Sequence, residues 1–453
     1  MRPRSLIAGV SFALAIYTTA QAADLAPQPT EVLYRGATLI DVATGTAKAD
    51  MAILTKGERI VAIGEAAHLA VPAGAKVVDV SGLYVTPGLI NTHEHLATPP
   101  NRPFAEAMMR RDVYGGTTAV RDMADDLRLV ADLARGALVG EIPGPDIYFA
   151  ALMAGPEFFD DPRTHQTTIG AIAGQVPWMQ AVTPRTDLPL AVARAKGTGA
   201  TAIKIYADLP ADLVSAITAE AHRQGLLVWA HAAVFPASPA QVIDAGADVV
   251  SHVCMLAYQA SSVMPRAYHH RAAVDEAPFA GGDNPVVGQL FKDMRARGTI
   301  LDATLLVYEE MAKEHAEDPK GPAPYCSETL AERLANQAWR DGVMISAGTD
   351  SFAPQPDPWP ALQDEMLLMQ NKAGMKPADV VRSATLIGAM TAHLQDQMGT
   401  IEPGKLANLV FVAQDPLKDV AAFKTITLTV KRGTPYWRKD YKPVTPTEMT
   451  SDQ

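Results

Sequence analysis

Short apolar segments alternate with longer amphipathic segments through the middle of this 453-residue chain. Eight short segments have the length and composition of buried β-strands, and a helical period of apolar residues is clearest at 209–224 and 377–394. The predicted strands cover residues 86–95, 117–123, 146–152, 202–207, 227–232, 249–253, 300–305 and 343–350. Because strands that alternate with helices form parallel sheets, this order predicts an α/β fold, a (β/α)8 TIM barrel with a few long loops.

The two ends of the chain have a different pattern. Short β segments separated by turn residues dominate 31–84, and further β segments occur at 408–413 and 425–431. Because the termini of a domain often lie close together, we expect both ends to join in one small β-sandwich. The predicted domains are a β-sandwich of residues 23–84 and 399–453 and a barrel of residues 85–398 inserted between them.

The first 22 residues have the features of a signal peptide. Arg2 and Arg4 supply the positive start, an apolar run covers 6–16, and Ala20-Gln21-Ala22 has the small-x-small pattern of a cleavage site. The apolar run is short for a membrane span, so an uncleaved anchor is the weaker alternative. The prediction is an exported protein, periplasmic or secreted, with no integral membrane segment after cleavage.

Charge and cysteine content limit the partners. The formal net charge of -11 and the lack of a basic cluster argue against nucleic acid or anionic lipid. A small-molecule substrate remains, and a homo-oligomer is compatible with the sequence. Export permits one disulfide between Cys254 and Cys326, but two cysteines are too few for a fold that is held together by disulfides. Because Cys254 follows a predicted core strand, we expect a buried free thiol there.

Polar side chains stand at the carboxyl ends of five predicted strands, where a barrel of this kind carries its active site. His93 and His95 end the first strand and, two residues apart, face the same side of it. Each residue alone has an ordinary explanation, since a lone histidine often completes a core and Asp350 could cap the next segment. Together, in this strand order, they predict one shared metal site. The candidate ligands are His93, His95, Lys204, His231, His252 and Asp350.

The segments that carry these residues resemble the amidohydrolase superfamily of metal-dependent hydrolases. The likeness rests on 85–95, on Ile203-Lys204-Ile205, on the two later histidines, on Gly348-Thr349-Asp350-Ser351 and on the closing 399–409, and it spans nearly the whole mature chain. It implies a TIM barrel with a small β-sandwich and a centre of two divalent metal ions. The implied ligands are His93, His95 and Asp350 for the first metal and His231 and His252 for the second, with a carbamylated Lys204 as the bridge.

Elementary chemistry is consistent with the implied centre. Burial and nearby cations lower a lysine pKa, and the neutral amine of Lys204 could then react with carbon dioxide to give an anionic carbamate. Imidazole and carboxylate ligands suit zinc first, with manganese, cobalt or iron as alternatives. Two metals about 3.5–4 Å apart would share a hydroxide that attacks the substrate. Asp350, the implied catalytic residue, would pass the hydroxide proton to the leaving nitrogen.

Two features point to one branch of the superfamily. Mononuclear deaminases usually carry a glutamate shortly after the fifth-strand histidine, but His231 is followed by Ala232-Ala233-Val234-Phe235. The segment 115–123 and the Ile-Lys-Ile strand look like the prolidase-like and imidazolonepropionase-like branch. That branch implies hydrolysis of a C–N bond in a dipeptide or an N-acyl amino acid. The chain departs from the branch at 153–159, which replaces a Gly-Gly-His segment, and at Ala233, which replaces a histidine.

A long loop is predicted after the sixth strand, at 255–291. Its Arg266 and Tyr268 are candidates for binding a substrate carboxylate from a lid, although a solvated insertion explains the loop equally well. Tyr206 faces the same side of the fourth strand as Lys204, so it either contacts the substrate or simply packs.

Other functions are compatible with the same residues. The site could hydrolyse an ester, a lactone, a carbamate or a phosphotriester in place of an amide. Lys204 alone could serve a Schiff-base aldolase. An inactive binding or scaffold protein is the alternative from another class, and it is disfavoured because all six ligand positions are filled.

Overall fold

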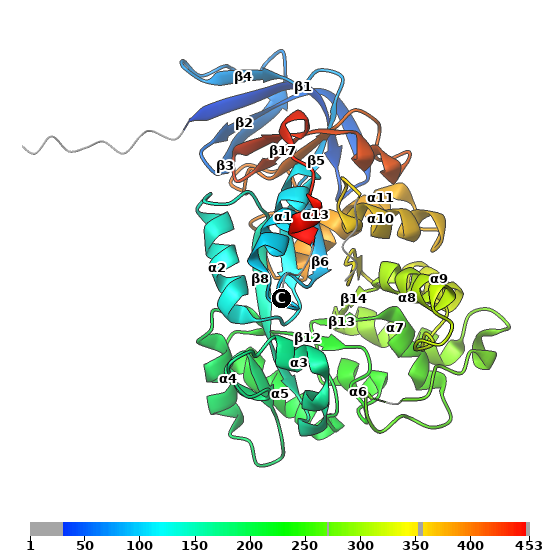
Figure 1. Cartoon of the computed structure of the whole chain (residues 1–453). Coiled ribbons are helices and arrows are strands. Elements are labelled where there is room, and N and C mark those ends of the chain that lie inside the picture. The colour runs from blue at the N-terminus through cyan, green and yellow to red at the C-terminus, as the bar shows by residue number, and fades with distance from the viewer. Residues whose placement is uncertain (1–29, 270, 352–356, 450–453) are drawn as a thin grey trace, which may run out of the picture.

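The computed structural model describes residues 30–269, 271–351 and 357–449, and the predicted signal peptide at 1–22 lies outside them. Figure 1 shows a β-sheet at one end of the molecule and, next to it, strands surrounded by helices. Among the described residues, no helix combines the length and the apolar character that crossing a membrane requires.

The sheet at one end is built from both termini of the described chain. Its strands are β1 (Glu31–Asp41), β2 (Thr46–Lys56), β3 (Arg59–Glu65), β4 (Lys76–Asp79), β5 (Tyr84–Pro87), β16 (Leu409–Val412), β17 (Ile426–Lys431) and β18 (Thr434–Trp437). Their order is β18-β17-β16-β5-β1-β2-β3, with β4 beside β1. β5 and β16 join the two termini in antiparallel register, with Val85 opposite Phe411. The prediction that both ends of the chain join in one small β domain is confirmed, and that domain is a mixed sheet. The exact domain bounds stay a prediction.

The central strands form the predicted barrel. They are β6 (Leu89–Glu94), β7 (Thr117–Asp122), β8 (Asp146–Ala154), β11 (Ala202–Ile205), β12 (Leu227–His231), β13 (Val249–Ser251), β14 (Ile300–Asp302) and β15 (Ile345–Ser346). Neighbouring strands are parallel from β6 through β15. The ring is nearly closed where the Thr92 amide donates to the Ala347 carbonyl at 2.9 Å and the Asp350 amide donates to the His93 carbonyl at 3.0 Å. The (β/α)8 prediction is therefore confirmed.

Helices lie around the barrel strands (Figure 1). The longer ones are α1 (Arg102–Tyr114), α2 (Leu127–Leu138), α4 (Leu188–Lys196), α5 (Ala211–Arg223), α7 (Pro285–Arg297), α8 (Leu305–Glu317), α9 (Glu328–Arg340) and α10 (Ala361–Asn371). Short elements are α3 (Pro162–Gln166), α6 (Pro239–Asp244), α11 (Pro377–Arg382), α12 (Gly388–Met390), α13 (Pro446–Met449), β9 (Gln175–Val176), β10 (Met179–Ala181), η1 (Pro156–Asp160), η2 (Val253–Ala260), η3 (Ala277–Phe279), the π-turn η4 (Ser383–Ile387), η5 (Val420–Thr425) and η6 (Arg438–Asp440). In α5, the predicted period buries Leu213, Ile217 and Ala221 on one face.

Three barrel strands end earlier than their apolar patterns predict. The chain leaves β13 at His252, and it turns again at Thr304 after β14 and at Asp350 after β15. These three residues have φ angles of 73°, 51° and 50°. A non-glycine residue in this left-handed region is uncommon and strained, and it interrupts the backbone hydrogen bonds between neighbouring strands. The strain is therefore concentrated at the carboxyl ends of the strands, where the predicted site lies.

The predicted free thiol at Cys254 is wrong, because Cys254 and Cys326 form a disulfide. Cys254 lies in η2, and Cys326 directly precedes Ser327, the N-cap of α9. Their Cα atoms are 6.2 Å apart although the residues are 72 positions apart in the chain. The local pattern correctly indicated burial, but it holds no information on a partner so far along the chain. The predicted loop at 255–291 also contains most of η2, all of η3 and the start of α7.

Candidate metal centre

The first barrel strand and the segment after the last one bring two histidines to one carboxylate. His93 lies in β6, and His95 follows the last residue of that strand. Their Nε2 atoms each lie 3.4 Å from Oδ1 of Asp350. Side chains alternate along a strand, which explains why both histidines face this carboxylate. His93 is 1% exposed and Asp350 is 7% exposed, so the contact is shielded from water.

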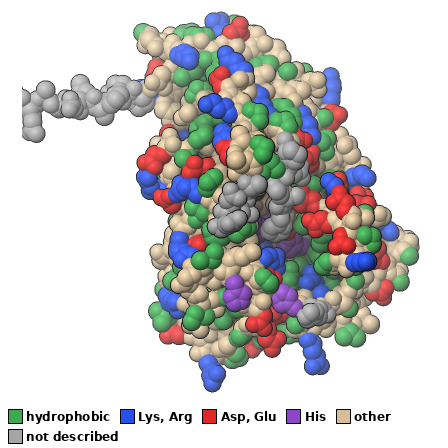
Figure 2. Space-filling view, in the orientation of Figure 1, with side chains coloured by type: hydrophobic (Ala, Val, Ile, Leu, Met, Phe, Trp, Pro, Cys, Tyr) green, Lys and Arg blue, Asp and Glu red, His purple; other side chains and the backbone are tan. Residues whose placement is uncertain are grey.

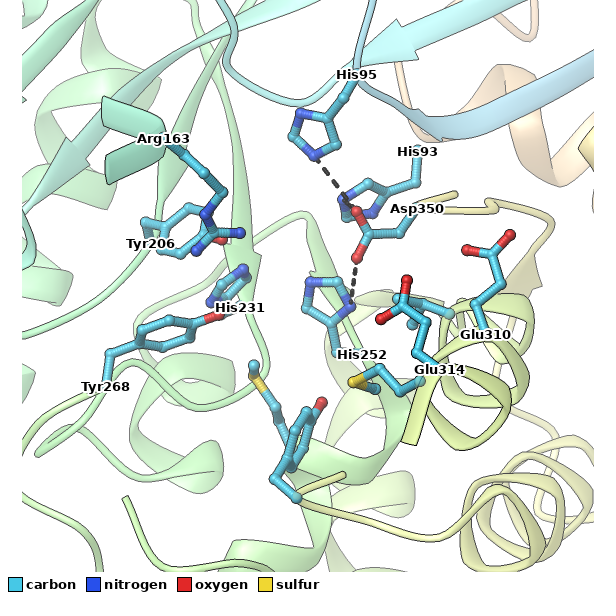
Figure 3. Close-up of a pocket in the computed structure, with 14 residues that line it drawn as sticks. His93, His95, Arg163, Tyr206, His231, His252, Tyr268, Glu310, Glu314 and Asp350 are labelled. Carbon is cyan, nitrogen blue, oxygen red and sulfur yellow. Dashed lines mark ion pairs between the residues drawn. The ribbon is translucent and has the colours of Figure 1, made fainter. Parts of the chain in front are cut away.

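His252 completes a group of three potential ligands. Its Nδ1 lies 3.7 Å from Oδ2 of Asp350 and 3.0 Å from Oγ1 of Thr304. Donor atoms of His93, His252 and Asp350 all lie within 4.8 Å of one another. Imidazole nitrogens and a carboxylate at such separations can contact one divalent cation. Figure 3 shows the Asp350 carboxylate among the imidazoles of His93, His95 and His252.

His231 and Lys204 come to the same region from two neighbouring strands. His231 ends β12, and its ring centroid lies 4.7 Å from that of His252. Lys204 lies in β11 and is completely buried. Within the described residues, neither Nδ1 of His231 nor Nζ of Lys204 has a hydrogen-bond partner. Buried polar atoms without partners are costly, so both atoms fit a site that takes a further ligand.

Two carboxylates that the sequence did not single out stand behind the first two histidines. Oδ2 of Asp302, in β14, lies 2.7 Å from Nδ1 of His93. Oδ1 of Asp125 lies 2.8 Å from Nδ1 of His95. If each Nδ1 donates the hydrogen of this bond, each Nε2, on the side of Asp350, is the ring nitrogen that remains for a cation. The signal available in the sequence was an acidic residue, Asp302, inside the apolar pattern of the seventh predicted strand.

Asp302 is held by several donors of its own. Thr92 donates its hydroxyl to Oδ1 at 2.9 Å, and Ser251 donates to Oδ2 at 3.0 Å. The Arg121 guanidinium lies 3.4 Å from Oδ2 and 4.4 Å from the centroid of the Trp229 ring. A buried carboxylate with this many partners keeps its charge and its orientation. These contacts place Asp302 where it can hold the ring of His93 in a fixed orientation.

The electrostatics favour the protonation states that metal ligation requires. Burial lowers the pKa of His93, and it lowers the pKa of His252 to about 3 against the charge of Asp350. Burial alone would raise the pKa of Asp350, but its electrostatic interaction with His93 and the hydrogen bond from His95 outweigh this effect and keep the pKa well below its usual value. Neutral imidazoles and an ionised carboxylate are the forms that bind metals.

His95 and Lys204 are shifted in opposite directions. Burial would lower the pKa of His95, but the charge and hydrogen bond of Asp125, together with Asp350, raise it to about 10. Burial lowers the pKa of Lys204 to about 7, although the charges of Asp302 and Asp350 oppose the shift. A cation that binds at His95 must therefore displace a proton, whereas the amine of Lys204 has a sizeable neutral fraction near neutral pH.

The centre opens into a cavity of about 180 Å³. Tyr206 and Tyr268, two of the predicted substrate contacts, line it, whereas Arg266 is exposed and is not among its lining residues. Arg163, in α3, lines the cavity and was missed. Arg163 lies shortly after 153–159, where the chain departs from the family pattern. That departure was the signal in the sequence that the residues lining the cavity differ here.

Comparison with known sequences identifies one family. A model of the amidohydrolase family matches residues 84–435. The dihydroorotase of Mycobacterium tuberculosis is 26% identical over 436 aligned residues, which cover 84% of this chain and 93% of that protein. An N-acyl-D-aspartate deacylase of Alcaligenes xylosoxydans is 42% identical over 73 residues, and adenine deaminase 2 of Agrobacterium fabrum is 40% identical over 106 residues. The chain spans only 14% and 17% of the length of these last two relatives.

Solved structures share the fold over most of the chain. A Xaa-Pro dipeptidase with bound methionine has a TM-score of 0.72 and 21% identity, and it covers 90% of this chain and 100% of its own. A protein described as a prolidase of Bifidobacterium longum has a TM-score of 0.69 and 24% identity, with 93% and 98% coverage. The ochratoxinase of A. niger has a TM-score of 0.70 and 18% identity, with 92% and 99% coverage. At these identities the likeness establishes the architecture.

Proposed function

Because the chain belongs to the amidohydrolase family, we propose that it is a metal-dependent hydrolase that cleaves the C–N bond of a small substrate, such as a dipeptide or an N-acyl amino acid. One observation carries the proposal: His93, His252 and Asp350 present donor atoms within 4.8 Å of one another, buried at the carboxyl ends of the barrel strands. Active sites of barrel enzymes lie at this end. The architecture shared with a Xaa-Pro dipeptidase supports the choice of an amide bond.

We propose that the centre holds two divalent ions and that both are zinc. His93, His95 and Asp350 would hold one ion, His231 and His252 the second, and a carbamylated Lys204 would bridge them. Among the residues that the structure describes, none is a hydrogen-bond partner of the buried Nζ of Lys204. This supports the bridge, because a carbamate would give this position oxygen ligands in place of an unsatisfied amine. Imidazole and carboxylate donors are the ones that zinc accepts.

When bound, the ions would supply Lewis-acid polarisation of the scissile carbonyl and would lower the pKa of water. The chain's own contribution to the reaction is proton transfer and orientation. Asp350 stays ionised and faces the centre, so one of its oxygens can accept the proton of the attacking water and deliver it to the leaving nitrogen. Asp302 and Asp125 hold the first two imidazoles in place during this transfer.

The test is metal analysis of the purified protein, followed by hydrolysis assays on dipeptides, N-acyl amino acids, esters, lactones and a phosphotriester. We expect bound divalent metal, amide hydrolysis, and loss of that activity with a chelator and in His252→Ala. Full activity in metal-free buffer would overturn the proposal. Hydrolysis confined to esters, lactones or phosphotriesters would support the same active site but refute the proposal that it cleaves a C–N bond.

We also propose that the protein is exported to the periplasm or the medium. The disulfide between Cys254 and Cys326 supports this, because disulfides persist in oxidising compartments. Cell fractionation with alkylation of free thiols tests it. The expected result is protein outside the cytoplasm with both cysteines protected, and a cytoplasmic protein with two reactive thiols would refute it.

A further inference from the structure

The cavity over the metal centre has two walls of opposite charge. Arg163, Tyr206 and Tyr268 form one wall. Glu310 and Glu314, both on α8, belong to the other. Figure 3 shows these two groups on either side of the histidines and Asp350. A ligand that spans the centre therefore meets a positive group at one end and negative groups at the other.

The positive wall is oriented by an ion pair. Asp161 accepts from Nε of Arg163 at 3.0 Å and from Nη2 at 2.7 Å. Within the described residues, Nη1 of Arg163 makes no hydrogen bond, so this side of the guanidinium can still donate. The Tyr206 ring lies 5.5 Å from that of Tyr268, centroid to centroid, and both border the same space. A guanidinium held in a fixed plane beside tyrosines suits a carboxylate.

The negative wall is one face of α8. Val307, Glu310, Met311 and Glu314 follow the i, i+3, i+4, i+7 spacing of a single helix face, and all four line the cavity. The start of the helix is fixed because Leu305 and Leu306 donate their amides to the buried Glu365, at 3.0 and 2.7 Å.

The two glutamates occupy different depths of this wall. Glu310 accepts a hydrogen bond from the Ser351 hydroxyl at 2.7 Å and is half-buried. Glu314 is exposed, and its carboxylate makes no hydrogen bond or ion pair within the described part of the chain.

We propose that the cavity binds an unblocked dipeptide lengthwise, with its α-carboxylate at Arg163 and its α-ammonium group at Glu310 and Glu314. This inference rests on the proposed function and deepens it, because it selects free dipeptides over N-acyl amino acids. The two charged groups of a dipeptide flank the scissile amide in the same way that the two walls flank the centre. An N-acyl amino acid keeps the carboxylate but offers the glutamates no cation.

A set of three matched substrates tests the proposal on the metal-loaded protein: a neutral L-dipeptide, its N-acetyl derivative and its C-terminal amide. Charged contacts near a surface contribute up to about 1 kcal/mol, so each blocked form should lose about 5-fold in kcat/KM. Hydrolysis of the N-acetyl form as fast as the free dipeptide would refute the inference and leave amide hydrolysis standing. If none of the three is hydrolysed, the proposed function itself fails.

Variants assign each end of the substrate to its wall. Glu314→Gln should lower kcat/KM for the free dipeptide about 5-fold and leave the N-acetyl form unchanged. Arg163→Gln should lower kcat/KM for the free dipeptide and not for its C-terminal amide. Thermal melting checks that the variant is folded. Glu309→Gln is the matched control, because Glu309 is exposed on the same helix and lies outside the cavity.

A lysine-containing substrate separates two sources of positive charge. N-acetylated peptides that differ only by lysine or norleucine are compared in wild type and Glu314→Gln. Neither peptide carries an α-ammonium group, so the expected result is that the substitution leaves kcat/KM for both peptides unchanged. A selective loss for the lysine peptide would show that the glutamates bind a basic side chain, and it would overturn the assignment. An equal loss for both peptides would also contradict the proposal, because it would mean that Glu314 acts without any cation on the substrate.

Discussion

Nδ1 of His93 lies 2.7 Å from Oδ2 of Asp302, and both side chains are buried. His95 has the same relationship to Asp125, at 2.8 Å. The candidate centre thus consists of two carboxylate–imidazole pairs that converge on a third carboxylate, that of Asp350. Outer carboxylates of this kind set the tautomer and the ring orientation of a metal-binding histidine. The metal affinity should therefore depend on residues that do not touch the metal.

Replacing Asp302 by asparagine should weaken metal binding by about 10- to 100-fold, the range typical of lost outer-shell partners. An amide at this position can donate to Nδ1 instead of accepting from it, which favours the wrong tautomer of His93. Competition titration with a chromophoric chelator measures the affinity. Ser251→Ala is the control, because it removes one donor to Asp302 and keeps the carboxylate. Equal affinities in wild type and Asp302→Asn would contradict the positioning role.

Metal affinity should fall as the pH falls from about 9 to about 6. With a pKa raised to about 10, the His95 imidazole is protonated below that pH, and a metal must displace the proton in order to bind. Lower pH therefore opposes binding. In Asp125→Asn the largest charge that raises this pKa is gone, so the same titration should show a shallower pH dependence. An affinity independent of pH would exclude His95 as a ligand.

Lys204→Ala should lose most of its turnover and regain part of it with short carboxylic acids such as acetate. The substitution removes the proposed bridging group from a fully buried position, and a small carboxylate can supply the missing oxygens. Steady-state rates with and without the acid measure the rescue, and wild type with the same acid is the control. Borohydride trapping of a substrate on Lys204 would instead support Schiff-base chemistry and refute the bridge.

Reduction of the disulfide should destabilise the protein and disturb the cavity. A cross-link between residues 72 positions apart contributes about 4 kcal/mol in the chain-entropy estimate. Met255 and Tyr325, the neighbours of Cys254 and Cys326, both line the cavity, so KM should rise as well. Denaturant unfolding with and without reductant measures the stability.

The double variant Cys254→Ser/Cys326→Ser provides the control for this prediction. It should behave like reduced wild type, and reductant should not change it further. Equal stability of oxidised and reduced wild type would show that the cross-link contributes nothing under the conditions used.

The sequence alone determined the barrel and the strand-end residues. Strands that alternate with helices bring their carboxyl ends to one rim whatever the lengths of the loops, so His93, His231, His252 and Asp350 could be expected together. Strand periodicity also placed His93 and His95 on one side. These inferences need only local patterns and chain order.

Tertiary structure decided the partners of those residues. Asp302 is 209 positions from His93, and Cys326 is 72 positions from Cys254. Arg163 reaches the cavity from a helix of five residues, too short to carry a readable period. Such contacts depend on how distant strands and loops pack against one another, and neither composition nor periodicity encodes that. The local sequence therefore specified which groups reach the barrel mouth, and only the packing of distant segments specified what holds them there.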